Sequence, residues 1–193
     1  MNQVYRISRN FYSMIEYSFD NDSIKLEDGR IVMHSWETPI MEKMANWVCS
    51  NGGDILEVGY GMGIASNFIQ QHKIDSHTIC EINDDVLSNL KEWSNDKPNV
   101  KILEGDWFDN RDRLKKYDGI LFDTYNDPNL FFFVEEFVHT LCKSKTNFTI
   151  WHWTNTDKIP YENVITERIE IQPPKNNYHD DNFFMLHKVT LHD

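Results

Sequence analysis

Short apolar runs alternate with amphipathic stretches through the middle and end of the chain. Runs of strand length occupy residues 54–58, 77–81, 100–103, 117–122 and 148–153. Between them, apolar residues recur at helical spacing in residues 64–71, 84–93 and 131–141. A buried strand gives a short continuous apolar run, whereas a surface helix repeats its apolar positions every three or four residues. The pattern therefore predicts strands and helices in alternation.

This alternation predicts the fold class. Strands separated by helices favour a parallel sheet that is covered by helices on both faces. Residues 164–171 and 183–191 alternate apolar and polar positions in part, which is typical of a half-buried antiparallel pair. We therefore predict an α/β fold of the Rossmann-like type: a doubly wound, mostly parallel sheet with an antiparallel C-terminal strand pair.

The chain has no repeat, low-complexity tract or linker-like segment, so its 193 residues predict a single domain, 1–193. Residues 1–50 differ from the rest because they are mostly polar. They include a predicted helix at 38–49, with Pro39 in its first turn. A segment of this kind in a doubly wound fold commonly lies over the ligand crevice. We therefore expect residues 1–50 to cover the active site.

Charge and composition narrow the range of partners. The formal net charge is −12, and no basic stripe that would bind phosphates is present. We therefore exclude nucleic acid as a partner, while a cationic substrate is compatible with the acidic balance. No N-terminal apolar segment or long apolar run predicts membrane insertion, so we expect a cytoplasmic protein. The oligomeric state stays open.

Metal binding is not indicated by the sequence. Cys49, Cys80 and Cys142 lack the spacing of a metal site and cannot all pair with one another. We interpret them as reduced thiols. The eight histidines show no paired ligand spacing either, and we expect no metal.

A glycine-rich turn follows the first predicted central strand. Gly59, Gly61 and Gly63 stand where the strand gives way to a helix, and glycine there permits a sharp turn and close approach of a cofactor. The G-x-G-x-G spacing differs from the G-x-G-x-x-G of nicotinamide dinucleotide sites, so an oxidoreductase is a minor alternative. Glu57 precedes the turn and suits the cationic methionyl end of S-adenosylmethionine.

Acidic residues also lie at or shortly after the ends of the next two predicted strands. Glu81 lies roughly 20 residues after the glycines, where a carboxylate accepts the ribose hydroxyls of a bound nucleoside. Asp106 and Trp107 follow the strand at 100–103. They either bind the adenine amino group and cover its face, or serve as a turn residue and a core aromatic. Together these residues predict an S-adenosylmethionine site.

Four segments resemble the guanidinoacetate N-methyltransferase family, which includes fungal arginine N-methyltransferases. They are residues 32–41 with Trp-Glu-Thr-Pro, residues 55–63 with the glycine turn, residues 101–107, and residues 117–125 with Asp-Thr-Tyr. The resemblance runs from about Ser23 to Leu141 and resumes weakly near the C-terminus. Trp-Glu-Thr-Pro and Asp-Thr-Tyr are specific to this family, whereas class I methyltransferases share the glycine turn.

The resemblance implies a substrate site. Glu37 and Asp123 match the pair of carboxylates with which the family holds the substrate guanidinium. Trp153 and Thr154 match the position of the backbone N–H groups that hold the substrate's carboxylate. Trp36 is either a core residue or a substrate contact, and Tyr125 either closes over the substrate or packs. The implied reaction is methylation of a small guanidino compound such as guanidinoacetate, with S-adenosylhomocysteine as the second product.

The sequence departs from the family at three places and leaves alternatives open. Gly63 replaces an alanine and looks more like the arginine branch, residues 142–146 replace a Pro-Gly-Gly turn, and the segment after residue 153 is short. Methylation of arginine in a protein is therefore one alternative. A non-catalytic S-adenosylmethionine-binding module is another, because the short segment leaves the substrate pocket more open.

Overall fold

The computed structural model describes residues 15–151, 159–175 and 177–193. Within them a seven-stranded sheet forms with the strand order β6-β5-β4-β7-β8-β10-β9. Its strands are β4 (Asp54–Val58), β5 (Ser76–Glu81), β6 (Val100–Glu104), β7 (Tyr117–Phe122), β8 (Cys142–Ile150), β9 (Val164–Glu170) and β10 (Phe183–Leu191). Strands β4 to β8 pair in parallel, and β10 pairs antiparallel with both β8 and β9. The predicted fold class is confirmed.

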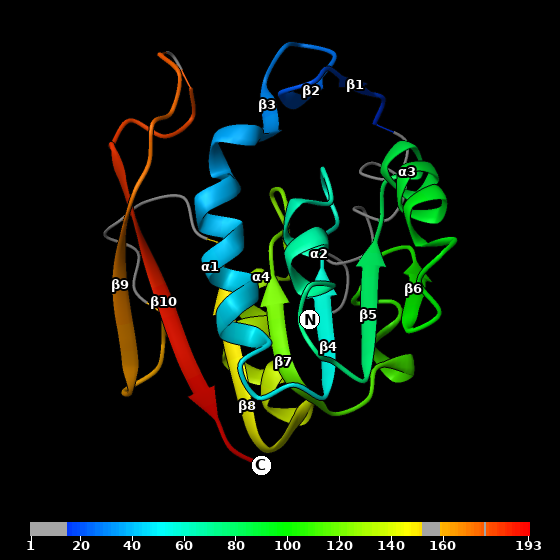
Figure 1. Ribbon diagram of the computed structural model, residues 1–193, viewed down its shortest axis with the longest axis vertical. Coiled ribbons are helices and arrows are strands. Elements are labelled where there is room, and N and C mark those ends of the chain that lie inside the picture. Colours follow the sequence, from blue (N-terminus) through cyan, green and yellow to red (C-terminus); the bar gives the residue numbers. More distant parts are fainter. Residues whose placement is uncertain (1–14, 152–158, 176) are drawn as a thin grey trace, which may run out of the picture.

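Helices cover both faces of this sheet (Figure 1). On one face lie α1 (Thr38–Val48), α2 (Ile64–Ile69) and α3 (Asp84–Ser94), and on the other lies a continuous helix of α4 (Leu130–Phe132), the π-helical η3 (Phe133–Phe137) and α5 (Val138–Thr140). Neighbouring side chains of β5 show the division, because Ile79 packs with α3 whereas Cys80 packs with the η3–α5 aromatic residues. The chain also forms two short 3-10 helices, η1 (Ser35–Glu37) before α1 and η2 (Arg111–Arg113) between β6 and β7.

Several element boundaries differ from the predicted ones by one or two residues, and β8 differs by more. Strand β8 begins at Cys142 rather than at residue 148, so the segment that replaces the family's turn is extended backbone. Its start is held by Thr146, whose hydroxyl donates to the Tyr117 carbonyl oxygen at 2.7 Å, next to a register irregularity between β7 and β8. Strand β8 ends at Ile150, three residues before the predicted end. Residues 152–158 lie outside the described part of the chain. Residues 159–163, which precede β9, are not helical.

A second small sheet was not predicted. Strands β1 (Tyr17–Phe19), β2 (Ser23–Leu26) and β3 (Ile31–His34) form an antiparallel meander. Figure 1 shows this meander beyond the carboxyl ends of the parallel strands, next to the start of α1. Its strands have three or four residues each, which is too short to give a periodic signal.

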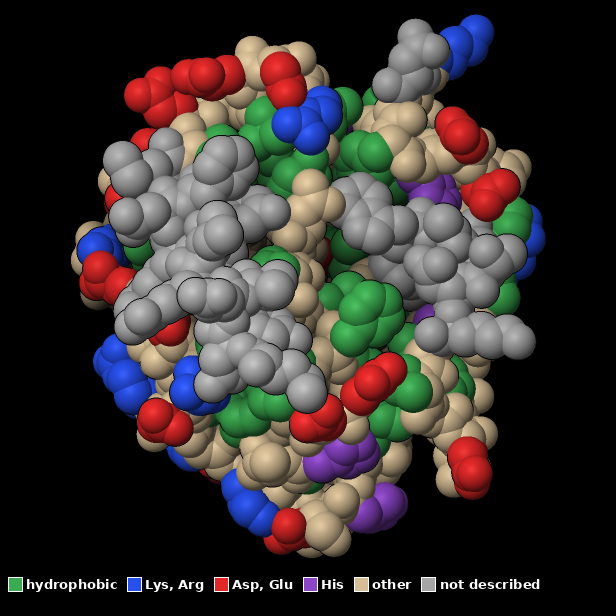
Figure 2. Space-filling model, turned by 180° about the vertical axis from the view of Figure 1, so that it is seen from behind, with side chains coloured by type: hydrophobic (Ala, Val, Ile, Leu, Met, Phe, Trp, Pro, Cys, Tyr) green, Lys and Arg blue, Asp and Glu red, His purple; other side chains and the backbone are tan. Residues whose placement is uncertain are grey.

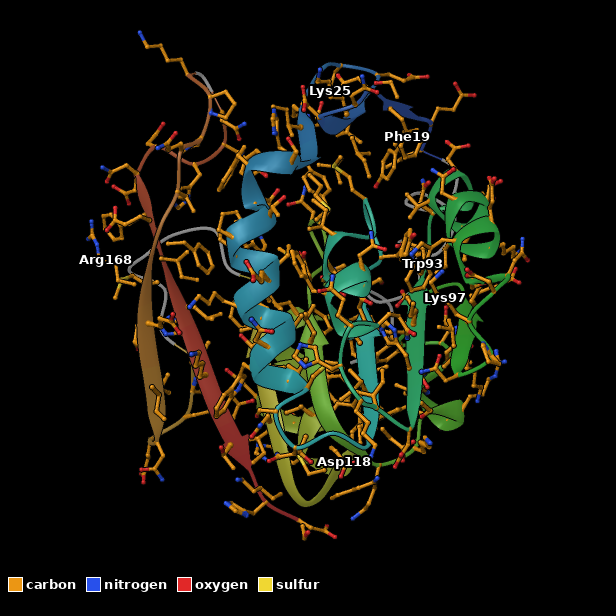
Figure 3. All side chains as sticks on the ribbon, viewed as in Figure 1. Phe19, Lys25, Trp93, Lys97, Asp118 and Arg168 are labelled. Carbon is orange, nitrogen blue, oxygen red and sulfur yellow. The ribbon has the colours of Figure 1, made fainter. Side chains whose placement is uncertain are left out.

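Charged side chains link the strands at one end of the main sheet. Asp118, labelled in Figure 3 at the end opposite Lys25 and Phe19 of the meander, accepts hydrogen bonds from the Asp54 N–H at 2.7 Å and the Lys143 ammonium at 2.6 Å. Lys143 also contacts the Asp54 carboxylate at 2.9 Å. This network ties β4, β7 and β8 together at their amino ends. A ligand crevice is expected at the other end, where the strands' carboxyl ends meet.

Candidate active site

A cavity opens at the carboxyl ends of β4, β5, β6 and β7. Ile24 and Met33 of the meander line one side of it, and Gly59, Glu81 and Asp106 line the strand-end side. Glu37 and Asp123 are also on its wall. The cavity is therefore built from both the N-terminal segment and the parallel sheet, where a doubly wound fold places its ligand.

The glycine turn connects β4 to α2 with three residues in the left-handed region. Gly59, Gly61 and Gly63 have φ of 91°, 54° and 69°, which L side chains rarely adopt. Gly59 and Gly61 line the cavity, whereas Gly63 is the N-cap of α2 and lies against the Tyr60 ring. Gly59 also passes very close to β7, because a Cβ placed there would stand 1.8 Å from the Asp123 carbonyl oxygen.

Gly59→Ala should therefore destabilise the protein strongly. Both clashing partners are backbone, so relief requires β4 and β7 to separate, and we expect a loss of about 3 kcal/mol or more. Gly29→Ala is the matched control, because Gly29 has a similar φ of 84° and a Cβ added there would meet nothing within 4 Å. Thermal unfolding measures both variants. Equal losses would show that backbone strain alone, and not the contact with Asp123, requires glycine at position 59.

Glu81 ends β5 inside the cavity wall. Its carboxylate accepts hydrogen bonds from the backbone N–H groups of Tyr60, Ile82 and Asn83, each at 2.8 Å. Burial raises the pKa of this carboxyl, and these N–H donors oppose the rise because they favour the charged form. The Gly61 N–H acts in the same direction, so the carboxylate is held against the glycine turn at the cavity wall.

Glu37 and Asp123 come from distant segments to the same cavity. Glu37 ends η1 before α1 and is only 3% exposed, while Asp123 directly follows β7. Burial, and then the charge of Asp123, raises the pKa of Glu37 to about 8. Burial, and then the charges of Glu57 and Glu81, raises the pKa of Asp123 to about 7. Several carboxylates around one buried space attract a cation, because each stays charged more easily beside a positive group.

Comparison with known families identifies the family of the chain. Residues 8–172 match the family described as guanidinoacetate N-methyltransferase. The chain belongs to the guanidinoacetate N-methyltransferase family. The predicted membership, and with it membership of the class I S-adenosylmethionine-dependent methyltransferases, is confirmed.

Curated relatives within this group carry another name. The chain is 38% identical over 128 residues to protein arginine N-methyltransferase 2 of Kluyveromyces lactis, a match that covers 60% of this chain and 31% of the relative. The protein of the same name from Saccharomyces cerevisiae is 36% identical over 129 residues, with the same coverage of 60% and 31%. The matched part of the chain thus spans about a third of the length of these relatives.

Solved structures agree with the family's fold. A putative methyltransferase from Escherichia coli superposes with a TM-score of 0.64 at 10% identity, covering 86% of this chain and 94% of that one. The spermidine synthase of Thermotoga maritima gives 0.61 at 16% identity, with coverage of 91% and 72%. At these identities the likeness concerns the fold alone.

Among the described helices, none has the length and apolar character that a membrane span requires.

Two residues that the strand pattern predicts for adenine binding line the cavity and also have structural contacts. Trp107 lines the cavity but is 3% exposed, packs against Phe122 and Phe133, and donates its indole N–H to Asp127 at 2.6 Å. Asp106 lines the cavity and also accepts the Phe108 N–H at 2.9 Å, as a turn residue does. Both functional roles therefore stay predictions beside a clear structural role for each residue.

Glu57 lies behind the glycine turn and is not among the described cavity-lining residues. Its carboxylate is 1% exposed, accepts the Ser66 hydroxyl at 2.5 Å and lies 2.8 Å from the His77 ring nitrogen. These contacts fix α2 against β4 and β5. The predicted contact of Glu57 with a methionyl group stays a prediction, with its carboxylate engaged elsewhere in this structure.

Only one of the four residues predicted to bind the substrate beside the carboxylate pair is seen to line the cavity. Tyr125 lines the cavity, whereas Trp36 lies in the hydrophobic core against Trp151. Trp153 and Thr154 lie outside the described residues.

Tyr178 was not predicted to reach the site. Its hydroxyl donates to Glu37 Oε1 from the β9–β10 connection, and no motif or periodicity marks the residue.

The sequence predicts that the chain has no basic stripe for nucleic acid. Figure 2 shows Lys and Arg side chains scattered between acidic ones over the described part of the face that it draws.

Proposed function

We propose that this chain transfers a methyl group from S-adenosylmethionine to a nitrogen of a guanidino group. The observation that carries the proposal is the convergence of Glu37 and Asp123 on the cavity that Gly59, Gly61 and Glu81 also line. A guanidinium is a flat cation with N–H donors on its edges, which paired carboxylates bind well. Residues 1–50 contribute Glu37 and the meander, and we propose that this segment covers the bound substrate.

The wall of the cavity fits the proposed cofactor. Glu81 would hold the ribose hydroxyls, because its carboxylate ends β5 on the cavity wall and is fixed there by backbone N–H groups. The glycine turn would accommodate the amino-acid part, and Asp106 with Trp107 the adenine. The cofactor supplies an electrophilic methyl on a sulfonium. The protein's task is then to present the acceptor nitrogen in line with that methyl.

A guanidinium is a poor nucleophile, and the two carboxylates would make its methylation possible. Its pKa is about 13.8, so removing a proton in advance at pH 7 costs about 9 kcal/mol. Asp123 instead takes a proton while the nitrogen–carbon bond forms, since the nitrogen's proton becomes acidic at that stage. A bound cofactor would leave as S-adenosylhomocysteine, because its sulfur would retain the electron pair of the broken sulfur–carbon bond. Glu37 balances the remaining charge and orients the plane of the guanidino group.

The acceptor is tested by supplying both candidate classes. The family description favours a small guanidino acid such as guanidinoacetate, whereas the names of the curated relatives and Gly63 favour arginine in a protein. Purified protein is incubated with methyl-labelled cofactor and either guanidinoacetate, free arginine or an arginine-containing peptide. Label in one acceptor identifies its class. Label in none of them, with cofactor bound, supports a non-catalytic binding module instead.

Glu81→Gln should weaken cofactor binding about tenfold, because it removes a charged acceptor of hydrogen bonds. Titration calorimetry with S-adenosylmethionine measures the change. Glu104→Gln is a matched control, since Glu104 pairs in register with Glu81 at the end of β6 but is exposed and bridges to Lys91. Equal affinities for the wild type and Glu81→Gln would remove Glu81 from the cofactor site.

A further inference from the structure

The connection between β9 and β10 reaches the acidic pair through one side chain. Tyr178 donates its hydroxyl to Glu37 Oε1, across a separation of 141 residues in the sequence. The ring of Tyr178 lies 5.5 Å from that of Trp36, the residue before Glu37. The C-terminal part of the chain thus contacts the acidic site directly, through the hydrogen bond from the Tyr178 hydroxyl to the buried Glu37 carboxylate.

The hydrogen bonds of Glu37 are divided unequally between its two oxygens. Oε1 accepts from the Tyr178 hydroxyl and from the His34 N–H at 2.9 Å. Within the described residues, Oε2 accepts no hydrogen bond from the protein, and Glu37 lines the cavity. A carboxylate held by both donors on Oε1 keeps Oε2 for an N–H group of a bound cation.

We propose that Tyr178 is a positioning residue that favours the ionised form of Glu37 and turns its carboxylate so that Oε2 meets the acceptor guanidinium. This inference rests on the proposed function. Tyr178 itself contacts neither the reacting nitrogen nor the methyl group in this scheme. It acts through Glu37, and losing its hydroxyl should change the pH at which Glu37 can bind a cation.

The groups around Glu37 set the direction of that change. Burial and the facing Asp123 raise the pKa of Glu37, whereas the Tyr178 hydroxyl and the His34 N–H lower it. His179 is also close, stacked on Trp36 at 5.6 Å, but its Nε2 lies 2.9 Å from the Phe183 carbonyl oxygen. Deleting the phenolic donor therefore raises the pKa of Glu37 further, so that more of the free protein is protonated at neutral pH.

Tyr178→Phe tests the proposal through a pH profile. We expect kcat/KM for the acceptor that the wild type methylates to fall about tenfold at pH 7, as for loss of one hydrogen bond to a charged group. The acid limb should move up by about one pH unit, and activity should recover at higher pH where Glu37 ionises. A purely structural role predicts a uniform loss with an unmoved limb, and an unmoved limb overturns the proposal.

Tyr161→Phe is the matched control. Tyr161 is also a partly buried tyrosine whose hydroxyl donates a hydrogen bond, in this case to the Val134 carbonyl oxygen on the other face of the sheet. Its variant should keep the wild-type acid limb. Placing 3-fluorotyrosine at position 178 gives a second test without loss of the ring, because a more acidic phenol donates more strongly and should move the limb to lower pH.

A direct titration separates this inference from the proposed function. Carbon-13 NMR of the Glu37 carboxyl in the free protein follows its ionisation without turnover. A higher midpoint in Tyr178→Phe than in the wild type supports the positioning role even if no acceptor is methylated, in which case the proposed function alone fails. Equal midpoints, together with methyl transfer by the wild type, leave the proposed function standing and overturn the role of Tyr178.

Discussion

Asp123→Asn should lower kcat for methyl transfer about a thousandfold, within the range typical of losing a general base. Asparagine has the same shape but cannot take the proton that the guanidino nitrogen loses as its bond to carbon forms. The backbone of Asp123 should stay in place, because its N–H donates to the Val58 carbonyl oxygen at 2.9 Å. We therefore expect cofactor affinity to change by less than about threefold, well under one lost charged hydrogen bond.

Single-turnover assays with labelled cofactor measure the rate, and calorimetry measures cofactor binding. Asp75→Asn is the control, because it makes the same chemical change at an exposed position before β5. A second readout is the pKa of Glu37, which should fall in Asp123→Asn since the Asp123 charge helps to raise it. Wild-type activity in Asp123→Asn would eliminate Asp123 as the base and favour a module that binds cofactor without catalysis.

The parts of the structure that the sequence predicts are those specified by local pattern. Strands β4, β7 and β10 have the predicted bounds, because their apolar runs are dictated by burial within a few consecutive residues. The glycine turn and the carboxylates at strand ends follow from the same pattern. Parallel strands bring such ends together, so Glu81 and Asp123 reach one cavity without further information.

The missed features leave no periodic pattern in the sequence. Strands β1 to β3 have three or four residues each, too few for a periodic signal, and are held by the meander's own pairing. The early start of β8 depends on the Thr146 hydroxyl at the Tyr117 carbonyl oxygen. Tyr178 lies in an irregular connection, and only the folded chain shows that it meets Glu37.

Glu37→Gln should have opposite effects on activity and stability. We expect kcat/KM to fall about a hundredfold, because a buried cation loses one of its charge partners. The free protein should nevertheless become more stable in alkaline solution. Glu37 has a pKa of about 8 in the folded state against an ordinary value of 4.5, so the folded protein binds more protons than the unfolded chain between these values. The wild type therefore loses stability as pH rises through this window.

Glutamine removes that pH dependence, so the difference in Tm should be small near pH 4.5, grow with pH and level off above about 8. For a chain of this length we expect a rise of about 3 °C or more at pH 8.5, corresponding to about 1 kcal/mol. Scanning calorimetry of both proteins across this range measures it. Glu42→Gln, an exposed change on α1, should leave Tm unmoved at every pH. A Glu37→Gln protein that is less stable than the wild type at pH 8.5 would mean that the carboxylate is not strained in the free site. Burial of the Glu37 carboxylate beside Asp123 would then not destabilise the free protein, and the site would have no electrostatic preference for a cation.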